Sequence, residues 1–291
     1  MARIALIIPH YNDTARLATC LGALAPQMTE AVELIVVDNG STEDLGPIEA
    51  LLQGRFPGAR LIHEPGKGAA FARNRGVAET TAPDLLFLDA DCVPGPDWLT
   101  TALSLAGRDR VVGGRVDVFD ETPPPRSGPE AFETVFAFHQ KTYVEGKGFS
   151  VTANLLTSRT VFDRTGPFIN ALSEDLDWCR RAVATGAPLV YEDALAVAHP
   201  TRQDWPALRK KWLRLTEEGF ATHGTNLPAR ASWALRAGAV LVSGPAHLPK
   251  VLHHDALSAV EKRRGAVTLL RLRGSRAVWM LRQALRGASK M

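Results

Sequence analysis

The sequence predicts an α/β fold: a mostly parallel, Rossmann-like sheet flanked by helices, followed by a helical, basic C-terminal region. Short apolar runs alternate with helical stretches over residues 1–115, the pattern of successive βαβ units. The runs LIVV and LLFL are continuously apolar, as expected of strands buried on both faces. Residues 200–291 hold 17 Lys and Arg against 5 Asp and Glu, whereas residues 1–199 hold 17 against 26. This asymmetry indicates two regions with different roles.

Strands and helices are expected to alternate through the first region. Apolar residues at helical spacing predict helices over residues 14–27, near 48–52 and over 69–79. The predicted strands are ARIALII, which ends at Pro9, VELIVVD, which ends at the turn Asn39-Gly40-Ser41, RLIHE, and DLLFLDAD, which leads into Cys92-Val93-Pro94.

The stretch DVFDETPPPRSGPE interrupts this alternation at residues 117–130. Three consecutive prolines cannot continue a helix or a central strand, so we expect a mobile loop or hinge there. An aromatic segment and a second α/β-like portion follow, to about residue 200. The rest is predicted to be helical, most clearly over 205–220 and 256–287. The expected regions are 1–115, 116–200 and 201–291.

The composition is that of a soluble protein with its own core. Of 291 residues, 45% are hydrophobic and 22% charged. The three cysteines, Cys20, Cys92 and Cys179, show no CxxC spacing, which argues against a disulfide framework and fits a reducing compartment. The N-terminus lacks the features of a signal peptide, and residues 237–242 are too short an apolar run to cross a bilayer. We therefore expect a cytoplasmic protein.

Carboxylates follow the predicted strands at the positions where open α/β sheets bind ligands. Asp38 ends the second strand, Asp89 and Asp91 end the fourth, and the pair Glu174-Asp175 lies in a polar turn before a later helix. Residues i and i+2 face the same way at a strand end, so Asp89 and Asp91 can converge on one cation. Mg²⁺ and Mn²⁺ prefer such oxygen ligands together with substrate phosphates. The alternative is a solvated acidic turn.

Five motifs resemble those of the inverting family 2 glycosyltransferases of the non-processive bacterial type, which have a GT-A fold. They are IIPHYND, VVDNGST, GKGAAFARNRGV, LFLDADCVP and SEDLDWCRR, in the family's order, over roughly residues 3–215. The resemblance implies transfer of a single sugar from a nucleotide-diphospho-sugar, expected to be UDP-linked, to a hydroxyl acceptor with inversion. It also implies a divalent metal, Mn²⁺ or Mg²⁺. Residues 1–115 would form the nucleotide-sugar half of the domain and 116–200 the acceptor and catalytic half.

The resemblance places the nucleotide at the first two strand ends. Pro9, Tyr11 and Asn12 match the loop that lines the nucleotide site, although they can also simply end a strand. Asp38 matches the acid that recognises the base, or it caps the Asn-Gly-Ser turn. Asn39 stands where many relatives have a second acid, which leaves the nucleobase open.

Phosphate and metal contacts are implied for the next segments. Lys67, in Gly66-Lys67-Gly68, can serve the phosphates as a point charge, and Arg73 and Asn74 lie in the segment that borders the nucleotide. A plain loop before a helix is the other interpretation. In the Asp89-Ala90-Asp91 motif, Asp91 matches the metal ligand, whereas Asp89 serves the ribose or binds the metal through water. His199, in VAHPTR, matches a histidine that completes the metal shell, or it is structural.

Asp175 matches the general base of the family's ED motif. It would take the proton from the acceptor hydroxyl, and like-charge repulsion from Glu174 and Asp177 is expected to raise its pKa. Ser173 and these acids also form a favourable start of a helix, and both interpretations can hold. Asp177 is the fallback base.

The chain departs from the family pattern in two places. It reads Gly166-Pro167-Phe168-Ile169-Asn170 where relatives commonly read Gly-Gly-Phe-Asp-Glu, and it lacks the QxxRW signature of processive synthases. Single-sugar transfer is therefore favoured over polymerisation, and the acceptor stays open among a glycan, a lipid-linked sugar and a small molecule. The aromatic residues over 132–149 and Asn154 lie where relatives build the acceptor side.

The basic C-terminal helices can contact an anionic membrane surface. Arginines and lysines alternate there with Leu269, Leu270, Leu272, Trp279 and Leu281. Packing on the core with a solvated basic face is the alternative. We expect no nucleic acid partner, because no supporting module is present. A peripheral location on the inner face of the cell membrane follows from the first interpretation. A noncatalytic nucleotide-sugar-binding or membrane-associated scaffold protein is the alternative function.

Overall fold

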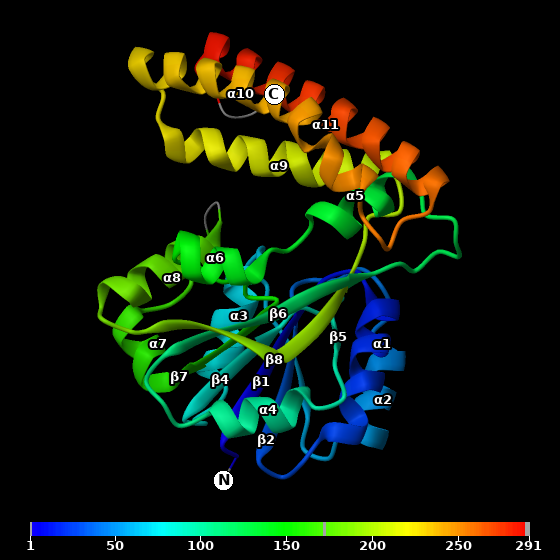
Figure 1. Cartoon of the computed structure of the whole chain (residues 1–291). Helices are drawn as coiled ribbons and strands as arrows, with labels where there is room; N and C mark the ends of the chain where they lie inside the picture. Colours follow the sequence, from blue (N-terminus) through cyan, green and yellow to red (C-terminus); the bar gives the residue numbers. More distant parts are fainter. Residues whose placement is uncertain (1, 171–172, 289–291) are drawn as a thin grey trace. The chain divides into compact units, whose positions relative to one another are not determined.

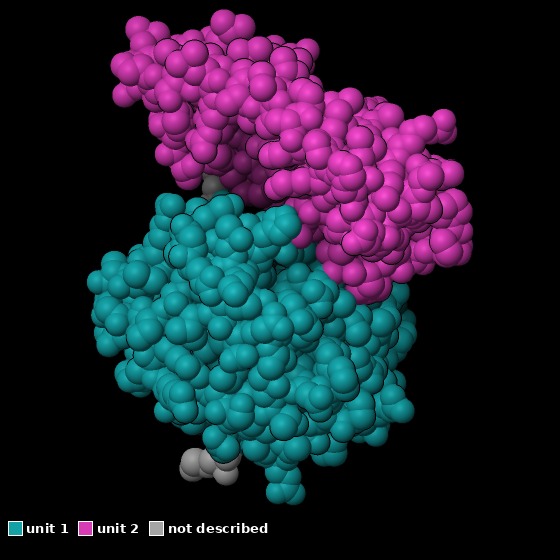
Figure 2. All heavy atoms as spheres, viewed as in Figure 1, with its two compact units in different colours: residues 1–117, 138–199 teal, residues 118–137, 200–291 magenta. Residues whose placement is uncertain are grey.

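The computed structural model describes residues 2–170 and 173–288. The chain divides into two compact units (Figure 2). The first unit comprises Met1–Asp117 and Phe138–His199, and the second comprises Val118–Ala137 and Pro200–Met291. Residues 118–137, which the sequence groups with the acceptor half, therefore cluster with the C-terminal helices.

The first unit is built on a mixed sheet with the strand order β3-β2-β1-β4-β7-β6-β8-β5. The four strands predicted from the sequence pair in parallel, β1 with β2 and β4, and β2 with β3. The later strands are antiparallel: β7 pairs with β4 and β6, and β5 pairs with β8. The strands are β1 (Ile4–His10), β2 (Val32–Asp38), β3 (Arg60–His63), β4 (Asp84–Leu88), β5 (Val93–Pro94), β6 (Val111–Phe119), β7 (Asn154–Ser158) and β8 (Leu189–Pro200).

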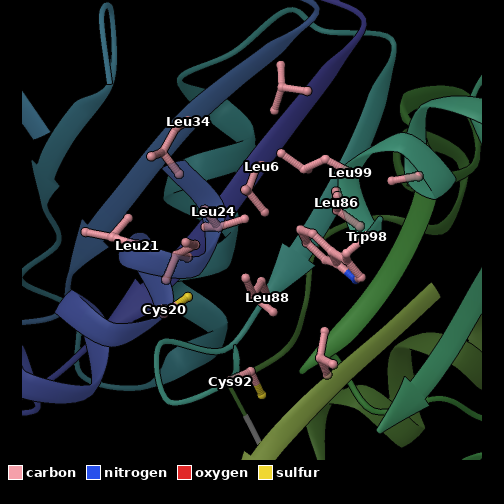
Figure 3. Close-up of a cluster of buried hydrophobic side chains, with 14 of the residues drawn as sticks. Leu6, Cys20, Leu21, Leu24, Leu34, Leu86, Leu88, Cys92, Trp98 and Leu99 are labelled. Atoms are coloured by element: carbon pink, nitrogen blue, oxygen red, sulfur yellow. The ribbon is translucent and has the colours of Figure 1, made fainter. Parts of the chain in front are cut away.

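Helices cover the sheet and bury its strands on both faces. Leu6, Leu34 and Leu86 pack on one face with Leu21 of α1 and Trp98 of α4 (Figure 3). Their neighbours along the strands point to the other face, where a second cluster includes Ala5, Ile7, Phe87 and Trp178. The helices of this unit are α1 (Thr14–Leu24), the short 3₁₀ helix η1 (Ala25–Gln27), α2 (Gly46–Arg55), α3 (Ala69–Ala78), α4 (Trp98–Leu105), α6 (Gln140–Lys147), α7 (Arg159–Thr165) and α8 (Glu174–Ala184).

The register of the parallel strands brings their carboxyl ends to one edge. His10 lies opposite Asp38, and Asp38 lies opposite His63. Phe87 of β4 lies opposite Ile7, so Asp89 and Asp91 follow at the same edge. This edge is where the predicted site residues gather.

The second unit is helical. It contains α5 (Gly128–Phe136), α9 (Trp205–His223), α10 (Leu227–Leu252) and α11 (Ala259–Arg286). Helices α10 and α11 run side by side and α9 packs against them (Figure 1). Phe132, Leu208 and Leu272 belong to one apolar cluster of this unit, and Phe220 and Met280 to another. In the described part of the chain no helix is long and apolar enough to cross a membrane.

The proline-rich segment is more regular than the sequence predicts. Strand β6 extends into it as far as Phe119, and α5 begins at Gly128, so the irregular part is residues 120–127. Ser127 and Glu130 form a capping box at the start of α5, and Pro129 stands in the first turn, where its missing N–H needs no partner. The Arg126 amide donates to Glu261 at 2.8 Å. These contacts, rather than the three prolines, define the segment's ends.

Candidate active site

Arg73 joins the acidic strand end to the acidic helix start. It projects from α3 and is 4% exposed. One terminal nitrogen donates to Asp89 Oδ1 at 2.7 Å, and the other donates to Glu174 Oε1 at 2.6 Å. Burial alone would lower the pKa of Arg73, but the two carboxylates raise it. The DxD motif and the ED motif are far apart in the sequence. The buried Arg73 side chain therefore links them by bonding to one carboxylate of each.

Asp175 is the second residue of α8 and lies in its first turn. Its Oδ1 accepts the Leu176 amide hydrogen at 2.8 Å. Burial raises the pKa of Asp175 to about 6; the charges of Glu174 and Asp89 add to this, whereas the Leu176 amide and Arg73 oppose it. A carboxylate in this state is ionised at neutral pH and still basic enough to accept a proton.

Asp91 and His199 form the pair best suited to a divalent cation. Strand β5 pairs with β8 so that Val93 lies opposite Ala198, which brings His199 beside the DxD motif. His199 Nε2 is 3.1 Å from Asp91 Oδ2, and the ring packs on Phe138 at a centroid distance of 4.9 Å. Among residues 2–170 and 173–288, no group of three or more His, Cys, Asp or Glu side chains is arranged to hold a metal. One oxygen and one nitrogen ligand fit a cation whose remaining ligands are phosphate oxygens and water.

Asp38 is 2% exposed and lies at the centre of a hydrogen-bond network. It accepts from the Gly40 and Ser41 amides at 3.2 Å, the capping arrangement that the sequence leaves open. His63 Nδ1 lies 3.2 Å and His10 Nδ1 3.4 Å from the carboxylate. Burial raises the pKa of Asp38, but these hydrogen bonds outweigh it and hold the pKa below its ordinary value.

His10 has a defined role that the sequence does not reveal. Its Nε2 accepts the Asp13 amide hydrogen at 3.2 Å. In the neutral ring, Nδ1 then carries the proton and donates toward Asp38. The buried histidine thus fixes the orientation of the Asp38 carboxylate.

The loop between β3 and α3 is clamped by two amide side chains. Asn39 Nδ2 donates to the Glu64 and Gly66 carbonyls at 3.2 and 2.5 Å, and its Oδ1 accepts from the Gly68 amide at 2.7 Å. Asn170 Nδ2 donates to the Lys67 carbonyl at 3.0 Å. The exposed Lys67 side chain therefore extends from a loop whose backbone is held on both sides.

The remaining predicted residues lie at the same edge with different environments. Pro9 is still within β1, and Tyr11 just beyond it is 61% exposed. Asn12 has a φ of +47° and accepts the Thr42 amide hydrogen at 2.7 Å, which shapes the following loop. Ala90, the middle residue of the DxD motif, is buried in the core cluster.

Asn74 and Asn154 make structural contacts. Asn74 exchanges two hydrogen bonds with the Phe168 backbone, at 2.8 and 2.9 Å. Asn154 is fully buried, and its Nδ2 donates to the Arg115 and Leu195 carbonyls, which joins β6 to β8. Both side chains use their hydrogen-bonding groups within the protein.

Three comparisons with known proteins agree on the class of protein. Residues 5–168 match the model of glycosyl transferase family 2. The glycosyltransferase AglE of Haloferax volcanii is 29% identical over 216 residues, 72% of this chain and 70% of that protein. YibD of Escherichia coli, an uncharacterized glycosyltransferase, is 34% identical over 107 residues, 37% of this chain and 31% of its own.

Solved structures show the same fold at low identity. The mannosyltransferase PcManGT from Pyrobaculum calidifontis, in complex with GDP-Man and Mn²⁺, has a TM-score of 0.57 at 15% identity, covering 98% of this chain and 73% of its own. Staphylococcus aureus TarS 1–349 in complex with UDP-GlcNAc has a TM-score of 0.53 at 14% identity, covering 98% and 81%. The fold is therefore that of the GT-A glycosyltransferases. Since the family model spans more than half of the 291 residues, this chain belongs to glycosyl transferase family 2.

Proposed function

We propose that this glycosyltransferase transfers a single sugar from a UDP-linked sugar to a hydroxyl acceptor, with inversion at the anomeric carbon. The observation that carries the proposal is the convergence at one sheet edge: Arg73 bridges Asp89 to Glu174, the neighbour of Asp175. Displacement of a diphosphate needs a base on the acceptor side and positive charge on the leaving-group side. The cluster joined by Arg73 brings the proposed base, Asp175, and the DxD motif, the proposed metal-binding segment, to the same edge of the sheet.

Asp175 is the proposed general base. Its carboxylate takes the hydroxyl proton as the acceptor oxygen attacks the anomeric carbon, while the bond from that carbon to the diphosphate oxygen breaks on the opposite face. A positioned base of this kind contributes roughly 10²–10⁴-fold to the rate. With a pKa of about 6, the carboxylate is mostly ionised near neutral pH and can accept the proton.

Asp91 and His199 are the proposed ligands of Mn²⁺ or Mg²⁺, and Asp89 is proposed to contact the ribose or to bind the metal through water. His199 must present Nε2 without its proton to bind a cation. A cation held there would neutralise charge on the leaving diphosphate. The Mn²⁺ in the PcManGT complex supports a divalent metal.

The nucleotide is proposed to bind along the edge that bears Tyr11, Lys67 and Asp38. Lys67, on its clamped loop, would contact the phosphates. The side chain of His63 is 64% exposed, so a uracil imide can replace it as a donor to Asp38. The UDP-GlcNAc complex of TarS supports a uridine donor, whereas the GDP-Man complex of PcManGT keeps guanosine as the competitor to test.

The reaction is proposed to occur in the cytoplasm, with the enzyme peripheral on the inner face of the cell membrane. Cys20, Cys92 and Cys179 are buried free thiols, in keeping with a reducing compartment. The acceptor is then a glycan, a lipid-linked sugar or a small molecule that carries a free hydroxyl.

Binding and turnover of UDP-, GDP- and dTDP-sugars with Mn²⁺ test the proposal. UDP is expected to bind in a Mn²⁺-dependent manner, and Asp91→Ala is expected to weaken that binding at least tenfold, since it removes one of two protein ligands. Asp97→Ala removes an exposed carboxylate of the neighbouring turn and should leave binding unchanged. Equal binding by Asp91→Ala would refute the metal site. Tight nucleotide-sugar binding without turnover on any hydroxyl acceptor would instead indicate the noncatalytic function.

A further inference from the structure

We propose that the solvent-facing side of α11 docks on the surface of an anionic lipid bilayer. This inference rests on the peripheral location proposed above and assigns it to one helix face. The docking face comprises the exposed apolar and arginine side chains of α11: Val260, Arg263, Arg264, Val267, Leu270, Arg271, Val278, Leu281, Arg282, Leu285 and Arg286.

The apolar residues of α11 fall into two sets on opposite sides of the helix. Leu269, Leu272 and Met280 are buried in the clusters of the second unit. The other set is exposed, with Val267 at 60% and Leu285 at 78%. The members of the exposed set recur at intervals of three, four, seven and eight residues, so they lie along one stripe. A helix packed only as part of a core does not need this second stripe.

The stripe is bordered by positive charge. Beyond Glu261, residues 262–291 contain no Asp or Glu. Arg263, Arg282 and Arg286 are exposed at positions that flank the apolar stripe. Two other arginines of the face are braced: Arg264 donates to the Arg126 carbonyl at 2.9 Å, and Arg271 stacks on Trp205 at 4.0 Å. The face therefore combines exposed apolar side chains with exposed guanidinium groups, two of which are held by contacts within the second unit.

An anionic bilayer satisfies both halves of this face. Valine and leucine side chains can enter the boundary between headgroups and acyl chains, while the arginines contact lipid phosphates. A nucleic acid would pair with the arginines but leave the apolar stripe in water. A second copy of the chain that covered the stripe with its own α11 would bring two basic borders together, which like-charge repulsion opposes.

Part of the basic character seen in the sequence is not available for docking. Lys211 is half-buried and paired with Glu133, with 2.6 Å between Nζ and Oε1. Arg276 stacks on Trp212 at 4.4 Å, and burial lowers its pKa to about 10. Trp279, Leu269 and Leu272 are core residues. The proposed membrane contact is therefore limited to one face of α11 and does not extend over the whole basic C-terminal region.

Vesicle flotation of the full chain tests the inference. Wild type is expected to float with vesicles of phosphatidylcholine mixed with phosphatidylglycerol and much less with phosphatidylcholine alone. Val267→Asp should lower the partition coefficient about tenfold, because it replaces an exposed valine, which the bilayer would cover, with a charge. The pair Arg282→Gln and Arg286→Gln should lower binding to the anionic vesicles roughly tenfold or more. Deletion of residues 256–291 is a poorer test, since it removes Met280 and Leu272 from the core.

Matched controls place the same changes elsewhere. Val183→Asp on α8 introduces the same charge at another exposed valine, and the pair Arg55→Gln and Arg108→Gln removes two exposed arginines of the first unit. Both should bind vesicles as wild type does, and all variants should keep the wild-type melting temperature and Mn²⁺-dependent UDP affinity. The proposal is wrong if the wild-type protein does not bind the anionic vesicles. It is also wrong if the control variants lose as much vesicle binding as the variants of the docking face. A dimer that Val267→Asp dissociates, without vesicle binding, assigns the face to a second copy. None of these outcomes bears on the donor site, which the UDP measurement reports separately.

Discussion

The surroundings of Asp175, the proposed general base, explain why its pKa is raised. The sequence predicts a raised pKa through repulsion from Glu174 and Asp177. The direction agrees with the structure, but burial is the first cause, and repulsion from Glu174 and Asp89 comes after it. Asp177 instead pairs with Arg181 at 2.9 Å, and Glu174 forms an ion pair with Arg73. Desolvation, which a sequence pattern does not report, therefore accounts for most of the shift.

The pH dependence of transfer follows from this environment. Because the base must be ionised, kcat should be constant above about pH 7 and fall as the pH drops through about 6, approaching tenfold per pH unit below it. Asp175→Asn should lower kcat by roughly 10²–10⁴-fold while UDP affinity stays within a few-fold of wild type. Steady-state kinetics between pH 5 and 9 measure both, with the pH range chosen to bracket the value of about 6.

Asp177→Asn is the matched control, since it neutralises a carboxylate of the same helix turn that pairs outward with Arg181. It should retain kcat within a few-fold. The folded-state pKa of Asp175, about 6, lies above the ordinary value of an aspartate. The ionised form is therefore disfavoured in the native state, and stability is lost as the pH rises from about 4 through 6. Asp175→Asn should therefore be no less stable than wild type at pH 8. Comparable turnover by Asp175→Asn would remove Asp175 from its role.

At the scale of elements, the sequence predicts the parallel half of the sheet well. Continuous apolar runs and the helices between them correspond to β1 to β4 and α1 to α3. These elements are bounded by local signals, such as the turn after Asp38. The antiparallel strands β6, β7 and β8 carry no comparable pattern. Their pairing depends on contacts distant in sequence, including the Asn154 amide that joins the carbonyls of β6 and β8.

The site follows the same division between local and distant information. Strand-end position identifies Asp89 and Asp91, and motif resemblance identifies Asp175. The sequence places Arg73 only in the segment that borders the nucleotide, and it predicts the hydrogen-bond partners of neither Arg73 nor Asn39, because Glu174 and Gly66 are 101 and 27 residues away. The pair Arg73-Asn74 is the signal that the sequence offers, and in the structure Arg73 contacts Asp89, whereas Asn74 bonds to the Phe168 backbone.

The loop between β3 and α3 gives a prediction at this scale. Asn39 donates to two carbonyls and accepts from one amide, and a carboxylate cannot make the two donations. Asn39→Asp should therefore release the loop that carries Lys67 and weaken UDP binding about tenfold, the effect of a lost hydrogen bond in a partly buried site. Lys67→Ala should weaken binding to a similar degree. The double variant should add little, because both changes act on one contact.

Titration calorimetry with UDP and Mn²⁺ measures these affinities. Gln53→Glu, on the exposed side of α2, is the control for the added negative charge and should bind as wild type does. Additive losses in the double variant would mean that Asn39 acts independently of Lys67.

At the scale of the whole molecule, the charge asymmetry persists between the two units, although it is smaller than between residues 1–199 and residues 200–291. The first unit holds 16 Lys and Arg against 22 Asp and Glu, a net of −6, and the second holds 18 against 9, a net of +9. The acidic first unit contains the carboxylates proposed for chemistry. The basic second unit contains the face proposed for lipid. The segment 118–137, with one Arg and four acids, is the part of the second unit that dilutes its charge.

Each unit has its own apolar clusters, so donor binding and second-unit stability should be separable. All proposed donor contacts lie in residues 1–117 and 138–199. UDP with Mn²⁺ at 100 times its Kd should stabilise the first unit by about 2.7 kcal/mol and slow exchange of its most protected amides roughly a hundredfold. Amides of α9, α10 and α11 should exchange as before. Leu272→Ala, in the second unit's core, should do the reverse: a loss of about 2–5 kcal/mol should speed exchange in those three helices and leave UDP affinity unchanged. Hydrogen exchange read by mass spectrometry resolves the two sets of helices. Equal protection of α11 by the nucleotide would show that the second unit takes part in donor binding, and the division of roles between the units would then be wrong.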